Sequence, residues 1–278
     1  MAELPDMENP QVREYFDRGY FVADDAVEPQ MLERIDAALR RCVAKIRSGA
    51  VVDDMEAIGV DGPGSEATHI RGLMAPEFGE GVFSEYLLSG PLHRYIRPFF
   101  GDRLRLGWVA CFAVGAQSYE IGWHRDVGHE ERDGSYEVEM EILQRYRKYQ
   151  IKWHLPLVDD ACLFLVPGSH LRGQTDEERN ALVNDKDGHI PGQKCIEMKK
   201  GQVGFWNGKT IHKGEMKKDV ERLTLAASWR KHSDDDPPEK IDGRFEWRLR
   251  ESVREALPEK MHLYYDRWKN LQLSEEAA

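Results

Sequence analysis

The feature that most constrains the fold of this 278-residue chain is a set of three typical metal-ligating side chains, split between two distant segments. His124 and Asp126 lie one residue apart in WHRD, and His212 follows much later in IHKG. In an extended strand, residues i and i+2 project from the same face, so His124 and Asp126 can reach one ion while Arg125 points away. His212 must then come from a second strand that folds back beside the first. The pattern therefore predicts a β fold that brings distant strands together.

The segments around the second histidine are typical of strands. GQVGFW alternates small, apolar and aromatic residues after a turn signal, and RLTLAASW has a period of two. His212 lies at the end of the first segment and Arg222 begins the second, with the polar stretch KGEMKKDVE between them. We therefore expect a hairpin that carries one metal ligand and one cationic residue.

The residue types indicate which metal and which co-substrate these side chains suit. Two imidazoles and one carboxylate on one face of an ion suit non-heme Fe(II) and leave the other positions open for small ligands and oxygen. A cation such as Arg222 suits a dicarboxylate that approaches the metal from a fixed direction. The pair His124 and Asp126 alone is also explained by a polar turn with a local hydrogen bond. The distant His212 and Arg222, both in strand context, favour the metal site.

With CLFLVPGSHLRG between them, these motifs resemble the phytanoyl-CoA dioxygenase family of Fe(II)- and 2-oxoglutarate-dependent oxygenases. The matching pieces are WHRD, LFLVPGSH and IHKG…ERLTLAASW, in that order, and the opening helix, strand and amphipathic helix of VREYFDRGYFVADDAVEPQMLERIDAAL. The resemblance implies that His124, Asp126 and His212 bind the iron. It also implies that Arg222 pairs with the distal carboxylate of 2-oxoglutarate. The expected enzyme uses O2 to hydroxylate or otherwise oxidise a C–H bond of a small-molecule metabolite, and it releases succinate and CO2.

One position departs from the family pattern and another agrees with it. Family members often carry a hydroxyl-bearing residue two positions after the distal histidine, where it helps to hold 2-oxoglutarate. This chain has Gly214 there, so the co-substrate needs another polar partner, and Lys152, Thr224 or Ser228 can supply it. Halogenating relatives replace the carboxylate ligand by a small residue that makes room for chloride. Asp126 is present here, which favours hydroxylation or a related two-electron oxidation.

Further inferences concern the substrate. Along QIKWHLP, the residues Gln150, Lys152 and His154 share one face of the expected strand. Such alternation is often a solvent face, but the resemblance places this strand inside the barrel, next to the co-substrate. There, Lys152 and His154 would favour a small polar or anionic metabolite. Arg71 in THIRGL is another candidate for substrate binding, with a surface ion pair as the alternative, and Trp123 is a third candidate.

The implied fold is mainly β with flanking helices (α+β), a double-stranded β-helix of the jelly-roll, cupin-like type. We expect one domain over residues 1–278, with a core of about 10–231 and a C-terminal helical extension of about 232–278. The charged segment 128–147 is expected to form a short helix, either a lid over the pocket or a solvent-exposed addition. The C-terminal helices would pack on the barrel or on a second subunit, and the latter arrangement would make a homodimer.

Three other segments carry local predictions. QIKWHLPLVDDACLFLVPGSH is expected to form a β-hairpin followed by a turn at Pro167 and Gly168. Local hydrogen bonds in that turn explain His170 better than metal binding does. LRLGWVACFAVG is apolar almost throughout, which indicates a strand buried on both faces. Residues 50–68 are rich in Gly, Asp and Pro and indicate a loop.

Composition bears on partners and compartment. The 39 basic and 50 acidic residues give a net charge of −11, which argues against binding to nucleic acid or to a membrane surface. No long apolar run is present, and the first ten residues are acidic rather than signal-like. The four cysteines are scattered without the paired spacing of a metal site, which favours free thiols in a reducing cytoplasm. We therefore expect a cytoplasmic enzyme, in a compartment that keeps iron ferrous.

Two functions of other classes also use parts of this pattern. A metal-dependent lyase or isomerase on a cupin-type barrel would use the ligands without oxygen, and it would need no anchor such as Arg222. A non-catalytic binding barrel would have lost at least one of the ligands, and none is lost here. Arg222 and the intact ligand set therefore favour the oxygenase.

Overall fold

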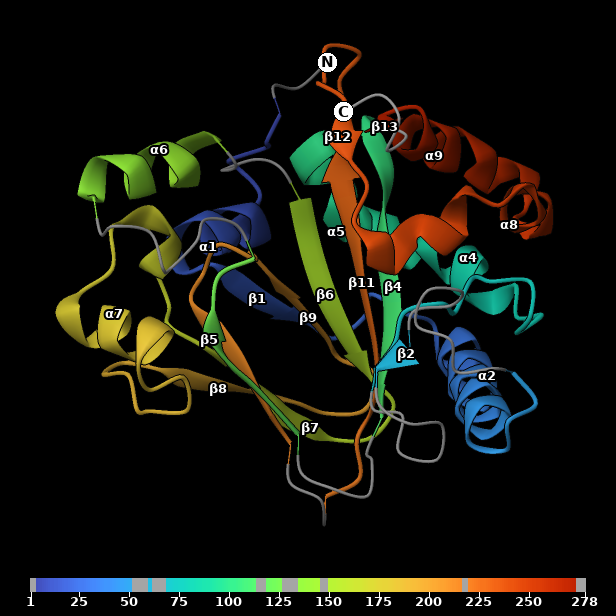
Figure 1. Cartoon of the computed structure of the whole chain (residues 1–278), viewed down its shortest axis with the longest axis horizontal. Coiled ribbons are helices and arrows are strands. Elements are labelled where there is room, and N and C mark those ends of the chain that lie inside the picture. Colours follow the sequence, from blue (N-terminus) through green and yellow to red (C-terminus); the bar gives the residue numbers. More distant parts are fainter. Residues whose placement is uncertain are drawn as a thin grey trace.

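Two antiparallel β-sheets that face each other form the centre of the computed structural model (Figure 1). The larger sheet has the strand order β1-β9-β6-β11-β4-β3-β2, and the smaller sheet has the order β5-β10-β7-β8. The structure describes residues 4–51, 60–61, 69–113, 119–126, 135–145, 150–216 and 220–273. The loop expected over residues 50–68 lies mostly outside these ranges.

From β4 onward, the chain crosses between the two sheets at almost every connection. The larger sheet consists of β1 (Tyr20–Ala23), β2 (Val60–Asp61), β3 (His69–Ile70), β4 (Leu104–Ala113), β6 (Gln150–Pro156), β9 (Val203–Trp206) and β11 (Leu223–Lys231). The smaller sheet consists of β5 (Tyr119–His124), β7 (Asp160–Leu165), β8 (Lys194–Met198) and β10 (His212–Met216). From β4 to β11, consecutive strands alternate between the sheets, except that β7 and β8 pair with each other. This alternation is the double-stranded β-helix that the sequence predicts.

The same crossing makes both predicted hairpins wrong. β6 pairs with β9 and β11, whereas β7 pairs with β8 and β10, so β6 and β7 belong to opposite sheets. His212 begins β10 in the smaller sheet, and Arg222 directly precedes β11 in the larger sheet. The metal ligand and the cationic residue therefore reach the interior from opposite walls. A period of two could not reveal this, because side chains alternate in the same way in either sheet.

Helices cover the outer face of the larger sheet. The helices α1 (Pro10–Arg18), α2 (Pro29–Arg47), α4 (Val82–Leu87), α5 (Gly90–Phe100) and α9 (Glu259–Lys269) share one hydrophobic core with that sheet. Ile151, Trp153 and Leu155 of β6 are fully buried in this core. β4 is buried at nearly every position, as its apolar sequence predicts. The larger sheet is therefore held in place by apolar packing on the face that points away from the barrel interior.

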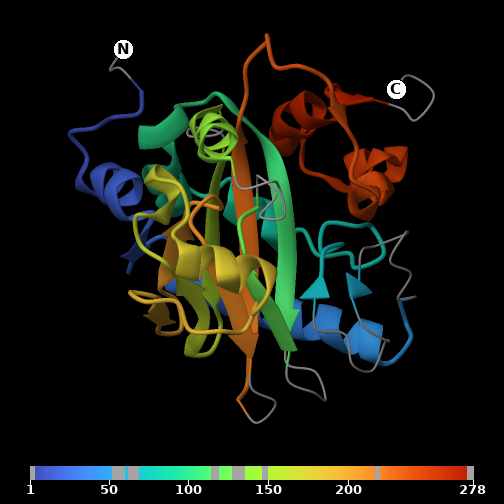
Figure 2. The same ribbon diagram turned by 60° about the vertical axis from the view of Figure 1, so that its left-hand side comes forward.

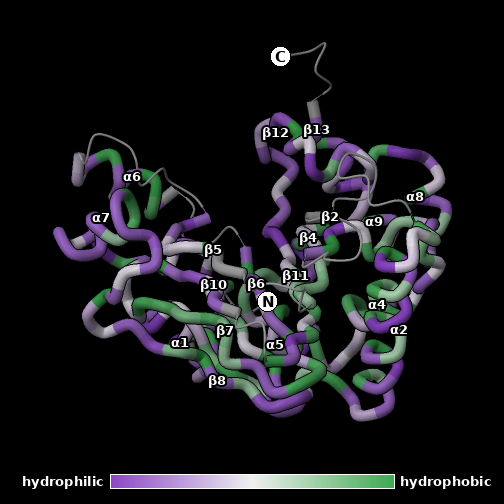
Figure 3. The backbone as a smooth tube through the Cα atoms, turned by 60° about the horizontal axis from the view of Figure 1, so that its bottom comes forward, coloured by the Kyte–Doolittle hydropathy of each residue, from purple (hydrophilic) through white to green (hydrophobic). Residues whose placement is uncertain are grey.

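A second, smaller core lies behind the other sheet. It contains Trp123, Val166, Ala181, Leu182, Ile190 and Ile211, and it includes the buried face of α7 (Asp176–Val183). The helix α7 begins with a capping box, in which the Thr175 hydroxyl accepts from the Glu178 N–H and the Glu178 carboxylate accepts from the Thr175 N–H. Figure 3 shows α6 (Tyr136–Arg145) and α7 on the side of the smaller sheet, and α2, α4 and α9 on the other side.

The segment after β11 forms η3 (Gly243–Leu249), α8 (Glu251–Ala256), α9 and a two-strand pair, β12 (Glu239–Lys240) with β13 (Gln272–Leu273). These elements lie beside β4 (Figure 2). Leu257 and Trp268 are buried, the Tyr264 ring lies 5.0 Å from that of Trp229, and Leu263 is 55% exposed. The predicted apolar face therefore packs largely on the barrel of its own chain. Among the described residues, no helix is both long and apolar enough to cross a membrane.

Candidate metal centre and its cavity

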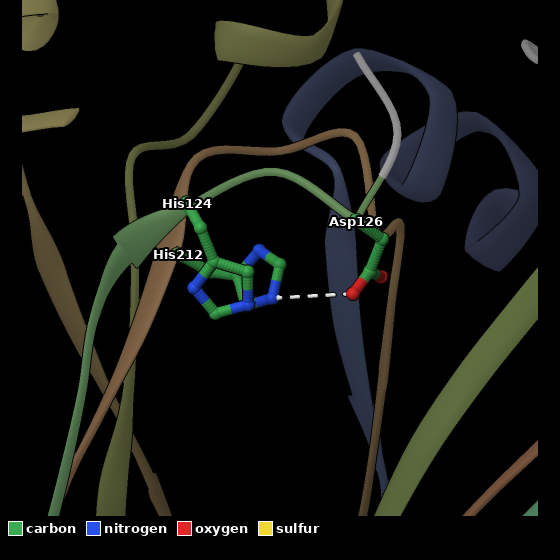
Figure 4. Close-up of side chains that lie close together, drawn as sticks. All are labelled: His124, Asp126 and His212. Atoms are coloured by element: carbon green, nitrogen blue, oxygen red, sulfur yellow. Dashed lines mark ion pairs between the residues drawn. The ribbon is translucent and has the colours of Figure 1, made fainter. Parts of the chain in front are cut away.

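The three predicted metal ligands lie together inside the barrel (Figure 4). His124 ends β5 and His212 begins β10, and the two residues are direct partners in the antiparallel pairing of these strands. His212 Nε2 lies 3.8 Å from Asp126 Oδ1. One ligand atom from each of the three residues lies within 4.8 Å of the others. Strand pairing thus joins the two distant parts of the motif into a group that can hold one metal ion.

Both histidines are held in the ring form that a metal requires. The Nδ1 atom of His124 lies 2.7 Å from the carbonyl oxygen of Gly122, and that of His212 lies 2.8 Å from the carbonyl oxygen of Thr210. A carbonyl oxygen can only accept, so Nδ1 carries the proton in each ring. Nε2 is therefore the ring atom available to a metal, and the backbone contacts orient both rings in the manner of an outer ligand shell.

Asp126 is held from three sides. Its N–H donates to the carbonyl oxygen of Gly208 over 2.8 Å, and its Oδ2 accepts from Lys152 Nζ, also over 2.8 Å. A Cβ atom at Gly208 would lie 2.9 Å from Asp126 Cγ, so only glycine lets the carboxylate take this position. Lys152 in turn lies over the Trp206 ring, with Nζ 4.0 Å from the ring centroid. The carboxylate is therefore oriented before a metal binds.

The protonation states suit metal binding. Burial by itself raises the pKa of Asp126, but the charge of Lys152, followed by the polar surroundings that the two histidines provide, outweighs it and holds the pKa below its usual value. Burial lowers the pKa of His212 well below its usual value, and the nearby His124 adds to the effect. The site therefore offers an ionised carboxylate and a neutral imidazole, which are the forms that bind cations.

Arg125, between the two ligands in sequence, points away from the metal site as predicted. It is buried and forms an ion pair with Glu139 of α6, and it donates to the carbonyl oxygens of Ser169 and Arg172. Ser169 Oγ accepts from the N–H of Ile211, the residue before the distal histidine, over 2.8 Å. These contacts tie the end of β5, the PGSH turn and the start of β10 together.

His170 of the PGSH turn serves the fold rather than the metal. Gly168 has φ 79°, which forms the predicted turn, and His170 Nε2 lies 2.9 Å from the carbonyl oxygen of Phe16. The partner belongs to α1, so this contact is long-range and not local as the sequence suggested. The motif therefore links α1 to the strand that carries the distal histidine.

A cavity of about 510 Å³ opens beside the triad, between the two sheets. Gln150, Lys152 and His154 line it, so the polar face of β6 points inward as the resemblance implies. Arg71 also lines the cavity. Trp123 does not: it is fully buried on the other face of β5, and its Nε1 donates to the carbonyl oxygen of Gly188 over 2.6 Å. This placement corrects the expectation that Trp123 contacts the substrate.

Arg222 reaches the cavity from the larger sheet and is anchored by a buried carboxylate. Its Nε donates to Asp160 Oδ2 over 3.0 Å, and Thr224 Oγ1 donates to the same oxygen over 2.5 Å. Asp160 Oδ1 accepts from the N–H of Cys162. Burial raises the pKa of Asp160, but Arg222 and these hydrogen bonds outweigh it and lower the pKa to about 2. The Phe112 ring lies 4.8 Å from the guanidinium carbon, so the guanidinium is held in one orientation.

Gly214 leaves space where the family often places a hydroxyl group. A Cβ atom there would meet only Ile121 Cβ, at 4.0 Å. Of the three residues proposed as substitutes, Thr224 donates to Asp160, and Ser228 Oγ accepts from the N–H of Trp108. Lys152 is the one that lines the cavity, where it donates to Asp126. Lys152 is therefore best placed to contact a co-substrate at the metal.

Several residues of the site were not identified from the sequence. Asp160 follows another aspartate in VDDACLF, and no local pattern separates a buried carboxylate from an exposed one. Gly208 lies in an ordinary NGKT turn, and its role depends on Asp126, far away in sequence. The cavity wall also includes Asp242, Arg244 and Phe245 of the C-terminal segment, for which the sequence predicts only helices that pack on the barrel or on a second subunit.

The helix expected in the segment 128–147 is present as α6, but no described residue of α6 lines the cavity. Leu143 accepts from Lys209 Nζ through its carbonyl oxygen, and Gln174 donates to Glu139 from its N–H. Residues 127–134 and 146–149 lie outside the described ranges. The hypothesis of a lid therefore stays untested.

Comparison with known proteins gives one family and a common fold. The family model of phytanoyl-CoA dioxygenase (PhyH) matches residues 15–218. Among solved structures, EctD from S. alaskensis with bound Fe has a TM-score of 0.60 at 17% identity, covering 83% of this chain and 79% of that one. HygX from Streptomyces hygroscopicus, with nickel, 2-oxoglutarate and hygromycin B bound, has a TM-score of 0.54 at 16% identity, covering 84% and 90%.

A third structure, EvdMO1, has a TM-score of 0.57 at 19% identity, and the match covers 80% of this chain but only 50% of that one. Among curated proteins, no significant sequence match is found. At these identities the structural matches establish a common fold, and they agree with the two-sheet topology described above.

Proposed function

The chain belongs to the phytanoyl-CoA dioxygenase (PhyH) family of oxidoreductases, and from this premise we propose that it is an Fe(II)- and 2-oxoglutarate-dependent dioxygenase of a small polar or anionic metabolite. It would oxidise a C–H bond of that metabolite and release succinate and CO2. The observation that carries the proposal is the His124, Asp126 and His212 group, with the Nδ1 atom of each histidine bonded to a backbone carbonyl. Such a donor set suits Fe(II) and leaves positions open for other ligands.

His124, Asp126 and His212 would hold the iron, which when bound supplies the activation of dioxygen. Lys152 keeps the carboxylate of Asp126 in its orientation through the 2.8 Å contact to Oδ2. The rings of Trp206 and His212 lie 4.3 Å apart, which restricts the imidazole further. The chain thus contributes ligand geometry, and none of these residues needs to act as a proton base.

Arg222 would bind the distal carboxylate of 2-oxoglutarate. Its Nε is bonded to Asp160, so the guanidinium is fixed before the co-substrate arrives, and less conformational entropy is lost on binding. Gly214 lines the same cavity from the opposite wall, in the smaller sheet, and the space next to it would admit the chain of the co-substrate. Leu163 of the smaller sheet and Phe112 of the larger sheet add apolar surface to the cavity, which keeps water away from the reacting atoms.

The compartment and the assembly belong to the same proposal. The four cysteines, all in the described residues, are free thiols, which supports a reducing cytoplasm. A homodimer stays a prediction, and a substitution of Leu263, which is exposed on α9, would test it.

The test is succinate formation from 2-oxoglutarate by the full chain with ferrous iron and ascorbate. Asp126→Ala should abolish both turnover and iron binding, because the remaining pair of histidines cannot complete the donor set. Asp102→Ala is the matched control, since that side chain is 78% exposed on the surface and should change neither property. If the wild-type chain neither binds iron nor forms succinate, the oxygenase proposal is wrong. Iron binding without succinate formation would favour the lyase, isomerase or binding-barrel alternatives.

A further inference from the structure

The outer part of the cavity is lined by three arginines from three separate elements. Arg71 follows β3, Arg230 lies near the end of β11, and Arg244 lies in η3. All three line the same cavity as the metal ligands. Arg71 is only 9% exposed, so its guanidinium has lost most of its hydration. A guanidinium in such an environment interacts more strongly with an anion in the cavity than one in bulk water does.

The carboxylates around these arginines are shared with other cations. Asp242 is engaged by Arg244, whose Nε lies 2.9 Å from Oδ1 and 3.0 Å from Oδ2. The hydrogen bond from Arg244 holds the pKa of Asp242 below its usual value despite partial burial, and the charge of Arg71 contributes to the same shift. Glu239 accepts from Arg230 over 3.3 Å and also from the buried Arg105 over 2.7 Å. Each of these two carboxylates therefore has more than one cation nearby.

Charge in the cavity opposes the charge of the whole chain. The lining residues include six cations and two carboxylates, although the chain has a net charge of −11, and the further carboxylates Asp160, Glu215 and Glu239 pair with three of these cations from behind the lining. The cations are Arg71, Lys152, Lys213, Arg222, Arg230 and Arg244, and the carboxylates are Asp126 and Asp242. Asp126 is a proposed metal ligand, and Arg222 is the proposed partner of 2-oxoglutarate. The outer arginines are thus left without a role in the function described above.

We propose that Arg71, Arg230 and Arg244 form an anion subsite for the primary substrate, separate from the site for 2-oxoglutarate. This rests on the proposed function and narrows its substrate class to small metabolites that carry a carboxylate or a phosphoryl group. Guanidinium groups bind both kinds of oxyanion through paired N–H donors. The anionic group is held at the outer wall, so a carbon atom further along the substrate faces the metal ligands.

Arg230 of β11 and Arg244 of the C-terminal segment complete this subsite. Arg230 and Arg244 both lie outside residues 15–218, the part of the chain that matches the family model. Phe245 lines the cavity beside them and packs against the main core, so η3 is fixed to the barrel while Arg244 lines the cavity. Substrate selection in this chain therefore depends on a segment that the shared motifs do not contain.

The experiment titrates simple anions into the full chain, prepared anaerobically with ferrous iron and saturating 2-oxoglutarate so that the inner site is filled. Methylphosphonate tests a phosphoryl group and propionate tests a carboxylate, with tryptophan fluorescence as readout because Trp108 lines the cavity. Arg244→Gln and Arg71→Lys should each raise the Kd of the preferred anion about tenfold. Arg244→Gln removes a charge-assisted contact, and Arg71→Lys removes the paired N–H donors of a bidentate contact. Arg71→Lys keeps the charge, which protects the fold at this buried position.

Arg41→Gln is the matched control, because Arg41 has a side-chain exposure of 56%, against 54% for Arg244, and does not line the cavity. It should bind the anion as the wild type does. Binding of neither anion in the presence of 2-oxoglutarate, or equal affinity in both cavity variants and the wild type, overturns the subsite. Succinate formation by the wild type is measured in parallel. Anion binding without succinate formation supports the subsite and contradicts the oxygenase proposal. Succinate formation without anion binding supports the oxygenase proposal and contradicts the subsite.

Discussion

Replacement of Gly208 by alanine should disable the metal centre without unfolding the chain. The new Cβ atom would lie 2.9 Å from Asp126 Cγ and 2.9 Å from Gln150 Nε2. Non-bonded carbon atoms prefer about 3.5 Å or more, so the carboxylate carbon must move by at least about 0.6 Å, the difference between 3.5 and 2.9, and the overlap of the new Cβ atom with Asp126 Oδ2 requires a larger shift still. Metal–ligand distances tolerate only about 0.2 Å. The carboxylate therefore leaves its position, and the Lys152 contact that orients it is lost as well.

The expected loss of metal affinity from Gly208→Ala is about 100-fold, the upper end of what disturbed outer-shell contacts cause, and this equals about 2.8 kcal/mol. Equilibrium dialysis with ferrous iron under anaerobic conditions measures it, together with succinate formation. Gly90→Ala is the control, since a Cβ at this first position of α5 meets nothing within 4 Å. The melting temperature of metal-free Gly208→Ala should stay close to that of the wild type, because the backbone there does not have positive φ. Wild-type iron affinity in Gly208→Ala would refute the reasoning.

Three further predictions concern the groups that support the site. Lys152→Met should weaken iron binding by about tenfold in the same dialysis assay, because Asp126 loses its orienting contact; unchanged affinity would contradict this. Asp160→Asn should raise the KM for 2-oxoglutarate about tenfold with a smaller change in kcat, since Arg222 loses its anchor; an effect on kcat alone would argue against that role. Burial, followed by the charge of Arg222, lowers the pKa of His154 to about 3, so below its usual value of 6.5 the unfolded state takes up a proton that the folded state does not. The free energy of unfolding should therefore decrease as the pH is lowered, by up to about 1.4 kcal/mol per pH unit from this residue. Urea unfolding at about pH 7 and about pH 5 should show a smaller loss of this free energy for His154→Leu than for the wild type.

The strands and helices were largely predictable because their signals are local. The periodic apolar residues of α2, the continuous apolar run of β4 and the alternation in β6 each depend on neighbours within a few residues. Pairing was not predictable in the same way. β6 and β7 follow each other in sequence and were expected to pair, but the barrel places them in opposite sheets.

The sequence by itself determined the donor chemistry of this chain: His124 and Asp126 at strand spacing, a second histidine at His212, and a cation at Arg222. These follow from residue type and from the period of two, which are properties of the chain before it folds. Only the tertiary structure decided what surrounds them. Asp160 became an anchor and Gly208 a necessary glycine because residues far apart in sequence were brought into contact, where burial and van der Waals exclusion act. The arginine-lined outer wall arose in the same way, from three elements that share no sequence motif.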